Sequence, residues 1–137
     1  MNKEFEGKVA VVTGGAGGIG RCIAEEFKKN GAEVCVIDMI PGEHFVGDIA
    51  DKDTLERFAA ETAARHGYID YLINNAPPLM KGINGCSYED FQHALSVGVT
   101  SPFYLSKLFL PYFSDGGSII NISSSRDRMS QPQTESY

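Results

Sequence analysis

The sequence has few features that would place it outside ordinary globular proteins. No stretch approaches the roughly 18 uninterrupted apolar residues of a transmembrane helix, and the first residues form no long apolar run. Basic residues are also scarce, with 12 against 18 acidic residues and a net charge of −6. This charge argues against nucleic acid or an anionic membrane as the main partner. We therefore expect a cytoplasmic protein that binds neither.

Cysteine and histidine are equally scarce, with three residues of each. An odd number of cysteines without a C-x-x-C pair argues against a disulfide framework, so we expect reduced thiols, with Cys22 and Cys35 in the core. The histidines His44, His66 and His93 have no spacing suited to zinc. The sequence therefore predicts no metal site.

The chain does contain a regular alternation of strand and helix patterns, and its 137 residues suffice for one domain. Strands are expected at about 9–13, 33–37, 44–49, 68–73 and 118–123, and helices at about 18–30, 51–67 and 88–112. This pattern predicts an α/β fold with a Rossmann-type, doubly wound parallel sheet in three α/β/α layers. Right-handed crossovers give the strand order 3-2-1-4-5. Residues 39–43 are too few for a crossover helix, so we expect an extended loop there.

The most informative segment is residues 8–20, KVAVVTGGAGGIG, in which an apolar strand runs into a glycine-rich turn and a helix. A backbone without Cβ atoms turns tightly and lets a pyrophosphate approach. The helix that follows points its free N–H groups at that phosphate. Asp38 ends the next strand, where a carboxylate accepts hydrogen bonds from a ribose 2′-hydroxyl. The alternative is a glycine-rich turn that binds no ligand.

A serine and a tyrosine frame the last part of the chain. Ser124 follows the fifth expected strand, at the sheet edge where open α/β sheets bind ligands, and Tyr137 comes thirteen residues later. This pair alone is weak evidence, because a serine after a strand is often a turn former or a helix cap.

Together these features resemble the short-chain dehydrogenase/reductase family over the whole chain. The resemblance rests on Thr13-Gly14-x-x-x-Gly18-Ile19-Gly20, Asp38, Gly47-Asp48-Ile49, Asn74-Asn75-Ala76, the segment 117–124, and Tyr137 at the family's spacing from Ser124. It implies hydride transfer between NAD(H) and a small-molecule alcohol or carbonyl substrate. Tyr137 would be the acid/base, and Ser124 would orient the substrate oxygen. The implied cofactor contacts are Gly14, Gly18, Ile19, Gly20, Asp38, Asp48, Ile49, Asn75 and Ala76.

The charges near the expected ribose site favour NAD over NADP. Asp38 would repel the additional phosphate of NADP, and neither Gly17 nor Met39 supplies a positive charge. Two of the implied contacts have plainer alternatives. Asp48 could be a turn-forming aspartate, and Asn75 could be a cap at the end of a strand.

Several features depart from the family's pattern. The chain ends at Tyr137, so the lysine that the family carries four residues later is absent, as are the later strands. We expect residues 1–137 to be a single dinucleotide-binding domain, the N-terminal part of a longer single-domain enzyme; a natural short form without activity is the alternative. Gly98 stands where the family usually has asparagine, and Pro77 where it has glycine. These departures favour a non-catalytic dinucleotide-binding module or an inactive family member as the alternative function.

The resemblance also implies a homo-oligomer, either a dimer or a tetramer. Family members commonly associate through the long helix that here carries Phe103, Tyr104, Leu108 and Phe109. We expect these side chains to be mostly core, with part of the stripe facing a partner. A weaker alternative is an assembly subunit whose nucleotide is only structural. The sequence does not identify the substrate, although Leu79 and Met80 are candidates for lining its pocket.

Overall fold

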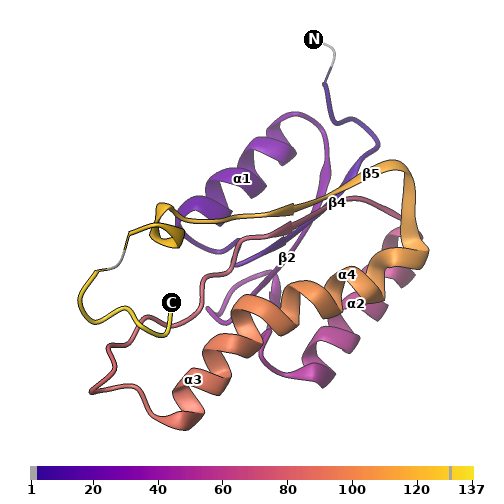
Figure 1. Ribbon diagram of the computed structural model, residues 1–137. Helices are drawn as coiled ribbons and strands as arrows, with labels where there is room; N and C mark the ends of the chain where they lie inside the picture. Colours follow the sequence, from indigo (N-terminus) through magenta and orange to yellow (C-terminus); the bar gives the residue numbers. More distant parts are fainter. Residues whose placement is uncertain (1–2, 130) are drawn as a thin grey trace.

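The computed structural model describes residues 3–129 and 131–137. Its centre is a five-stranded parallel sheet in the order β3-β2-β1-β4-β5, with helices on both faces (Figure 1). The strands are β1 Val9–Thr13, β2 Glu33–Asp38, β3 Phe45–Val46, β4 Ile69–Asn74 and β5 Phe113–Asn121. The helices are α1 Gly18–Lys29, α2 Lys52–His66, α3 Tyr88–Leu95 and α4 Ser101–Phe109, with short segments η1 Ser96–Thr100, η2 Leu110–Tyr112 and η3 Ser125–Asp127. The predicted fold class and strand order are confirmed.

The central strand β1 is buried along its whole length and separates two cores. Val9 and Val11 pack in the cluster beneath α2 and α4, whereas Ala10 and Val12 pack in the cluster beneath α1. This division follows from strand geometry, because successive side chains point to opposite faces of a sheet. The apolar run in the sequence therefore corresponds to a strand that is covered by helices on both sides.

The helix starts follow from local sequence signals. The Asp51 carboxylate accepts a hydrogen bond from the Thr54 N–H at 2.9 Å and caps α2. Ser87 and Asp90 form a reciprocal capping box at the start of α3. α2 ends at Gly67, whose φ of 78° is left-handed and therefore suits glycine. These local signals set the start of the helices that cover one face of the sheet.

The structure corrects three expectations about the elements. β3 has two residues instead of six, and only Phe45 and Val46 pair with β2. The expected continuous helix from 88 to 112 contains the π-helical segment η1. β5 begins earlier, at Phe113, and Gly116 has a φ of 81° close to an irregularity in the pairing with β4.

The expected core position of Cys22 is also wrong, because its side chain is exposed on α1. Ile19, one turn earlier, is 66% exposed. The buried face of α1 is instead formed by small residues such as Ala24. The first turn of this helix therefore presents apolar surface to solvent.

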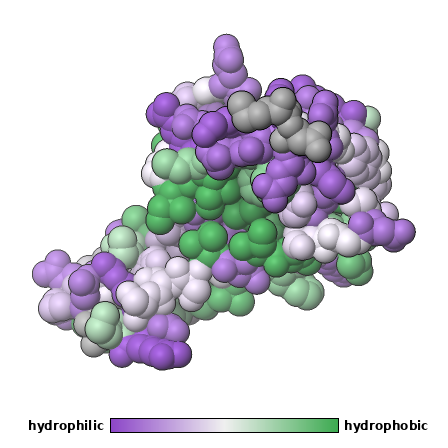
Figure 2. Space-filling view, turned by 90° about the horizontal axis from the view of Figure 1, so that it is seen from above, coloured by the Kyte–Doolittle hydropathy of each residue, from purple (hydrophilic) through white to green (hydrophobic). Residues whose placement is uncertain are grey.

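The outer strand β5 leaves apolar side chains uncovered. Ile119 and Ile120, with Ile122 just beyond the strand, are about two-fifths exposed. Figure 2 shows a hydrophobic area on the face seen from above, surrounded by more polar surface. Within the described ranges, no helix is both long enough and apolar enough to cross a membrane.

Candidate functional site

The glycine turn between β1 and α1 has a shape that side chains would prevent. Gly14 and Gly18 have φ angles of 67° and 53°, in the left-handed region that favours glycine. A Cβ on Gly20 would overlap the Gly14 carbonyl oxygen and the Asn75 side-chain amide. The first turn of α1 can therefore approach the end of β1 only because position 20 has no side chain.

The N-terminus of α1 is open to a ligand. Gly17 occupies the N-cap position without a side-chain hydrogen bond, and the first turn contains no acidic residue. Space is also free on this side, because a Cβ added to Gly17 or Gly18 would meet no described atom within 4 Å. The first N–H groups of a helix have no partner within the helix, and the helix dipole is positive at this end. The residues present thus fit the pyrophosphate of a dinucleotide.

The glycine turn is held by Asn75, which follows the neighbouring strand β4, and by Thr13 at the end of β1. The Asn75 amide donates to the carbonyl oxygens of Thr13 and Gly14 at 3.1 and 3.3 Å. In return, the Thr13 hydroxyl oxygen accepts hydrogen bonds from the N–H groups of Asn75 and Ala76 at 3.0 and 3.1 Å. The structure therefore places Asn75 and Ala76 as supports of the turn, and Thr13 is a member of the site that the sequence analysis did not single out.

Asp38 lies beside the same turn with both carboxylate oxygens engaged. One oxygen accepts from the Ala16 N–H and the other from the Ile40 N–H, each at 3.0 Å. These contacts join the end of β2 to the glycine turn and to the short loop 39–43. The side chain is thereby held beside the glycine turn.

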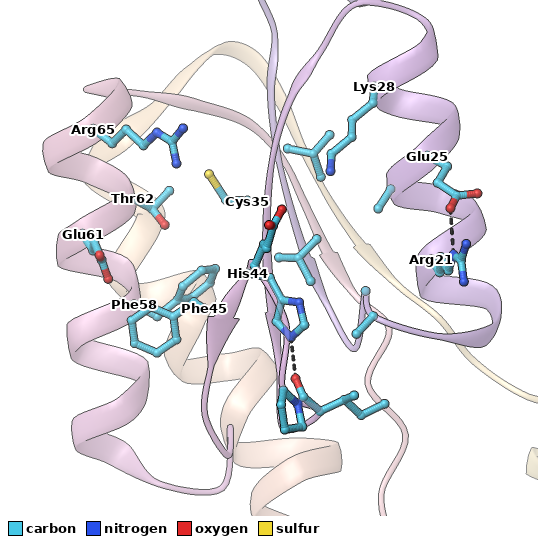
Figure 3. Close-up of a pocket in the computed structure, with 18 residues that line it drawn as sticks. Arg21, Glu25, Lys28, Cys35, His44, Phe45, Phe58, Glu61, Thr62 and Arg65 are labelled. Carbon is cyan, nitrogen blue, oxygen red and sulfur yellow. Dashed lines mark hydrogen bonds and ion pairs between the residues drawn. The ribbon is translucent and has the colours of Figure 1, made fainter.

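A cavity of about 640 Å³ extends around the open edge of β2 and reaches Gly15 and Ala16 of the glycine turn (Figure 3). It is open because β3 covers only the end of β2, so α1 and α2 both contribute to its walls. His44 bonds the Ile40 carbonyl oxygen at 2.7 Å and folds the short loop over this edge. Arg21 also lines the cavity, but its charge is paired with Glu25 at 2.7 Å. The cavity wall beside the glycine turn therefore gains little positive charge from Arg21.

Asp48 and Ile49 follow β3 and have different surroundings. One Asp48 carboxylate oxygen accepts from the Ala50 N–H at 2.8 Å, and the other contacts the His93 ring of α3 at 2.7 Å. Ile49 is buried in the core. Asp48 is therefore both a turn former and a contact to α3 through His93. No spacing in the sequence indicates this contact.

The two candidate catalytic residues are linked through a third residue. The Ser124 hydroxyl oxygen accepts from the Arg126 N–H at 3.3 Å and caps the short helix η3. The Arg126 guanidinium lies over the Tyr137 ring, 5.4 Å from its centre. Ser124 and Tyr137 themselves form no hydrogen bond with each other. Ser124 thus has the capping role that the sequence analysis kept as an alternative, and its hydroxyl proton has no acceptor among the residues that the structure describes.

The segment that ends in Tyr137 lies beside the loop after β4 (Figure 1). The Ser136 hydroxyl donates to the Leu79 carbonyl oxygen and accepts from the Lys81 N–H, both at 2.7 Å. The Lys81 ammonium contacts the Asp90 carboxylate at 2.8 Å, and this bond, followed by that from the Ser87 N–H, holds the pKa of Asp90 below its ordinary value. A continuous set of bonds therefore connects the start of α3 with the residue before Tyr137.

Gly98, one of the two departures from the family pattern, lies close to the residue that follows the other departure. Gly98 is in the π-helical segment η1, and a Cβ on it would lie 3.5 Å from the ring of Pro78, the residue after Pro77. Pro78 therefore borders the space into which an asparagine side chain at position 98 would extend.

Sequence reasoning missed His93, Arg126 and Ser136. Arg126 carried a usable signal, because it is a cationic residue two positions after a candidate catalytic serine. Within residues 3–129 and 131–137, no group of three or more His, Cys, Asp or Glu side chains is arranged to hold a metal ion.

Comparison with known proteins gives a consistent result. The family model described as short chain dehydrogenase matches residues 8–137. L-fucose dehydrogenase of Mus musculus is 34% identical over 97% of this chain and 54% of its own length. An apo SCOR enzyme from Clostridium thermocellum has a TM-score of 0.86 at 38% identity, over 96% of this chain and 59% of that one. A metagenomic short-chain oxidoreductase in complex with NADP has a TM-score of 0.85 at 26% identity, over 97% and 68%.

The chain is shorter than these relatives. It spans 54% to 59% of the length of three similar curated proteins, two L-fucose dehydrogenases and an oxidoreductase of Thermotoga maritima.

The glycine turn allows a matched test. Gly20→Ala should lower the free energy of unfolding by about 1–2 kcal/mol, because the methyl group overlaps the Gly14 carbonyl. Within a helix, alanine is otherwise more favourable than glycine by about 1 kcal/mol. A net loss of stability in Gly20→Ala would therefore be due to the overlap. Gly17→Ala is the control, since Gly17 has a φ of −154° and open space around it. Urea unfolding of the full-length protein measures both, and equal stability of the two variants would contradict this account of the turn.

Proposed function

The chain belongs to the short chain dehydrogenase family, and we propose that it is an oxidoreductase that transfers hydride between NAD(H) and an alcohol or carbonyl substrate. The observation that carries this proposal is a shared sheet edge. The uncapped N-terminus of α1 lies at the carboxyl end of β1, and Ser124 follows the carboxyl end of the parallel strand β5. Ligands of open α/β sheets bind at this edge.

The cofactor would be held by main-chain groups and by one carboxylate. Gly18, Ile19 and Gly20 offer N–H groups to the pyrophosphate, and Asp38 offers its oxygens to the ribose. Asp48 would border the adenine, and Ile49, whose side chain is buried in the core, would do so only through its main chain. When bound, the nicotinamide ring would supply or accept the hydride.

In the direction of reduction, the carbonyl carbon gains the hydride and the Tyr137 hydroxyl gives its proton to the carbonyl oxygen. Ser124 donates a hydrogen bond to the same oxygen as negative charge develops on it. In the direction of oxidation, Tyr137 takes the proton of the alcohol while the carbon loses the hydride. These roles require a substrate oxygen that bridges the two side chains, because they do not bond each other directly.

A non-catalytic dinucleotide-binding module is the second candidate. The observation that favours it is the packing of Pro78 beside Gly98, in place of a polar side chain in the long helix. Such a module would bind NAD(H) with the same glycine turn but would not depend on the Tyr137 hydroxyl. Loss of this hydroxyl would therefore lower the activity of an oxidoreductase but would not affect a module that only binds NAD(H).

Replacing Tyr137 by phenylalanine provides that test. In the full-length protein we expect Tyr137→Phe to lower turnover by about 10²–10⁴-fold while NADH affinity is unchanged, because only the proton donor is lost. Ser124→Ala should lower turnover by roughly 10²–10³-fold. NADH absorbance measures turnover with the best substrate, and calorimetry measures NADH affinity.

The control for this test is Tyr112→Phe, since Tyr112 is a partly exposed tyrosine of η2. Near-native turnover in Tyr137→Phe would rule out the acid/base role. If no carbonyl or alcohol substrate is found for the unaltered protein while NADH still binds, the non-catalytic module becomes the better interpretation.

We propose NAD(H) as the preferred cofactor because the Asp38 carboxylate lies beside the glycine turn and would repel a ribose phosphate. NADP in the metagenomic relative shows that another family member binds the other cofactor, so the preference needs its own test. Asp38→Ala should raise the ratio of NADP to NAD affinity by roughly ten- to a hundredfold, through lost repulsion and a lost ribose hydrogen bond. Calorimetric titration with both cofactors measures the ratio, with Asp115→Ala as a control for an exposed carboxylate on β5. An unchanged ratio would assign selectivity to other residues.

A second copy of the chain is the proposed partner. Exposed apolar side chains follow one another along α3, η1 and α4 to the start of η2, at intervals of four or seven residues: Tyr88, Leu95, Val99, Phe103 and Leu110. Helix residues at these intervals lie on one face, and an exposed apolar face of this kind fits a protein interface. We also propose a cytoplasmic location, since the three cysteines are free thiols.

Phe103→Glu should shift the full-length protein from a dimer or tetramer to a smaller species, because it places a charge in the proposed interface. Sedimentation analysis with and without NAD measures the mass. The control is Ile83→Glu, which changes an equally exposed residue in the loop before α3. A wild-type monomer, or a variant of unchanged mass, would refute this interface.

A further inference from the structure

Arg126 contacts both candidate catalytic residues. Its main-chain N–H donates to the Ser124 hydroxyl oxygen, and its guanidinium lies over the Tyr137 ring. The same guanidinium donates to the Met80 sulfur at 3.0 Å. A positive charge is therefore fixed beside the atoms that would handle the substrate oxygen.

The Arg126 charge has no carboxylate partner among the described residues, since none lies within 4.0 Å of its guanidinium. The thioether that it contacts is only a weak acceptor, and a guanidinium has five N–H donors. The neighbouring Arg128 differs, because it pairs with Asp127 at 3.9 Å and points into solvent. Arg126 thus keeps most of its donors free for an anion.

These free donors line a cavity of about 390 Å³, within the range of small-molecule sites. Tyr137 forms part of its wall, together with Met129, Pro132 and Glu135. Glu135 is the acidic residue of this lining, and its carboxylate is bound to the loop after β4 through the Ile83 N–H at 3.0 Å. Among the described residues, the lining thus combines the Arg126 guanidinium and the proposed proton donor with apolar Met129 and Pro132 and polar Gln131 and Thr134.

Building on the function proposed above, we propose that Arg126 binds a carboxylate of the substrate beside Tyr137, so that the substrate pair is a small oxo acid and its hydroxy acid. A carboxylate matches the planar fork of a guanidinium with two parallel hydrogen bonds. The carboxylate is unchanged in the reaction: the oxo carbon gains the hydride, and its oxygen gains the Tyr137 proton. Arg126 is then a specificity-determining residue that acts by charge and geometry.

Binding can be measured separately from turnover. Oxamate, an unreactive carboxylate, should shift the NMR signal of the Arg126 side-chain N–H in the full-length protein, whereas the neutral oxamide should not. The affinity for oxamate should fall at least tenfold in Arg126→Gln. Arg128→Gln is the matched control and should bind oxamate like the unaltered protein. The absence of any shift at Arg126 with oxamate would overturn the proposal.

Turnover then tests specificity. The ratio of kcat/KM for pyruvate over neutral pyruvamide should fall roughly thirtyfold or more in Arg126→Gln, mainly through KM, and should be unchanged in Arg128→Gln. Arg126→Lys retains the positive charge but not the planar guanidinium, so it should give an intermediate ratio. This variant also provides the test if Arg126→Gln does not fold. If neutral carbonyls are turned over and the pyruvate to pyruvamide ratio is the same in Arg126→Gln as in the unaltered protein, the proposal is refuted. The oxidoreductase function would not be affected by that result. Oxamate binding at Arg126 without turnover of any substrate would support the carboxylate site and refute the oxidoreductase function.

Discussion

The close approach of α1 to the end of β1 is the constraint on which the rest of the site depends. Gly20 can lie against the Gly14 carbonyl only without a Cβ, and the Asn75 amide donates to that same carbonyl from β4. Three separate parts of the chain therefore converge on one peptide group. This convergence aims the free N–H groups of the helix outward and fixes Asp38 beside them through the Ala16 N–H. A larger residue at position 20 would disturb the turn, the strand end and the carboxylate together.

The second half of the site is built differently, from loops that bind each other. β4 and β5 bring the loop after β4 and the segment after Ser124 to the same sheet edge, but their positions are set by single hydrogen bonds. Ser136 joins the two through the Leu79 and Lys81 main chain, and Lys81 extends the contact to α3. The proposed cofactor side thus rests on rigid packing, whereas the proposed substrate side rests on polar contacts between loops. This division suits a fold in which the cofactor contacts are main-chain groups and specificity depends on side chains.

The parts of the fold that local chemistry decides could be predicted from the sequence. The alternation of strand and helix led to the correct strand order, and the helix starts expected at about 51 and 88 agree with the caps Asp51 and Ser87 in the structure. The length of β3 could not be predicted. The short connection 39–43 replaces a crossover helix, and how many residues then pair with β2 depends on the path of this loop in the folded chain. The exposure of Cys22 could not be predicted either. Helical spacing indicates which residues share an apolar face, but whether that face is buried depends on the layer that packs against the helix. Arg126 and His93 escaped because their partners are distant in sequence, 46 residues away for Met80 and 45 for Asp48.

Gly98, one of the two departures from the family pattern, lies beside the proline that directly follows the other departure, Pro77. Pro78 lies in ordinary contact distance of the position that a Cβ on Gly98 would take. Gly98 is exposed, so a polar side chain there would pass the ring of Pro78 and still reach solvent. The widened turn of η1 therefore has room for a side chain at this position. Packing does not require the glycine, so Gly98 remains an argument for altered catalysis that is independent of Pro77.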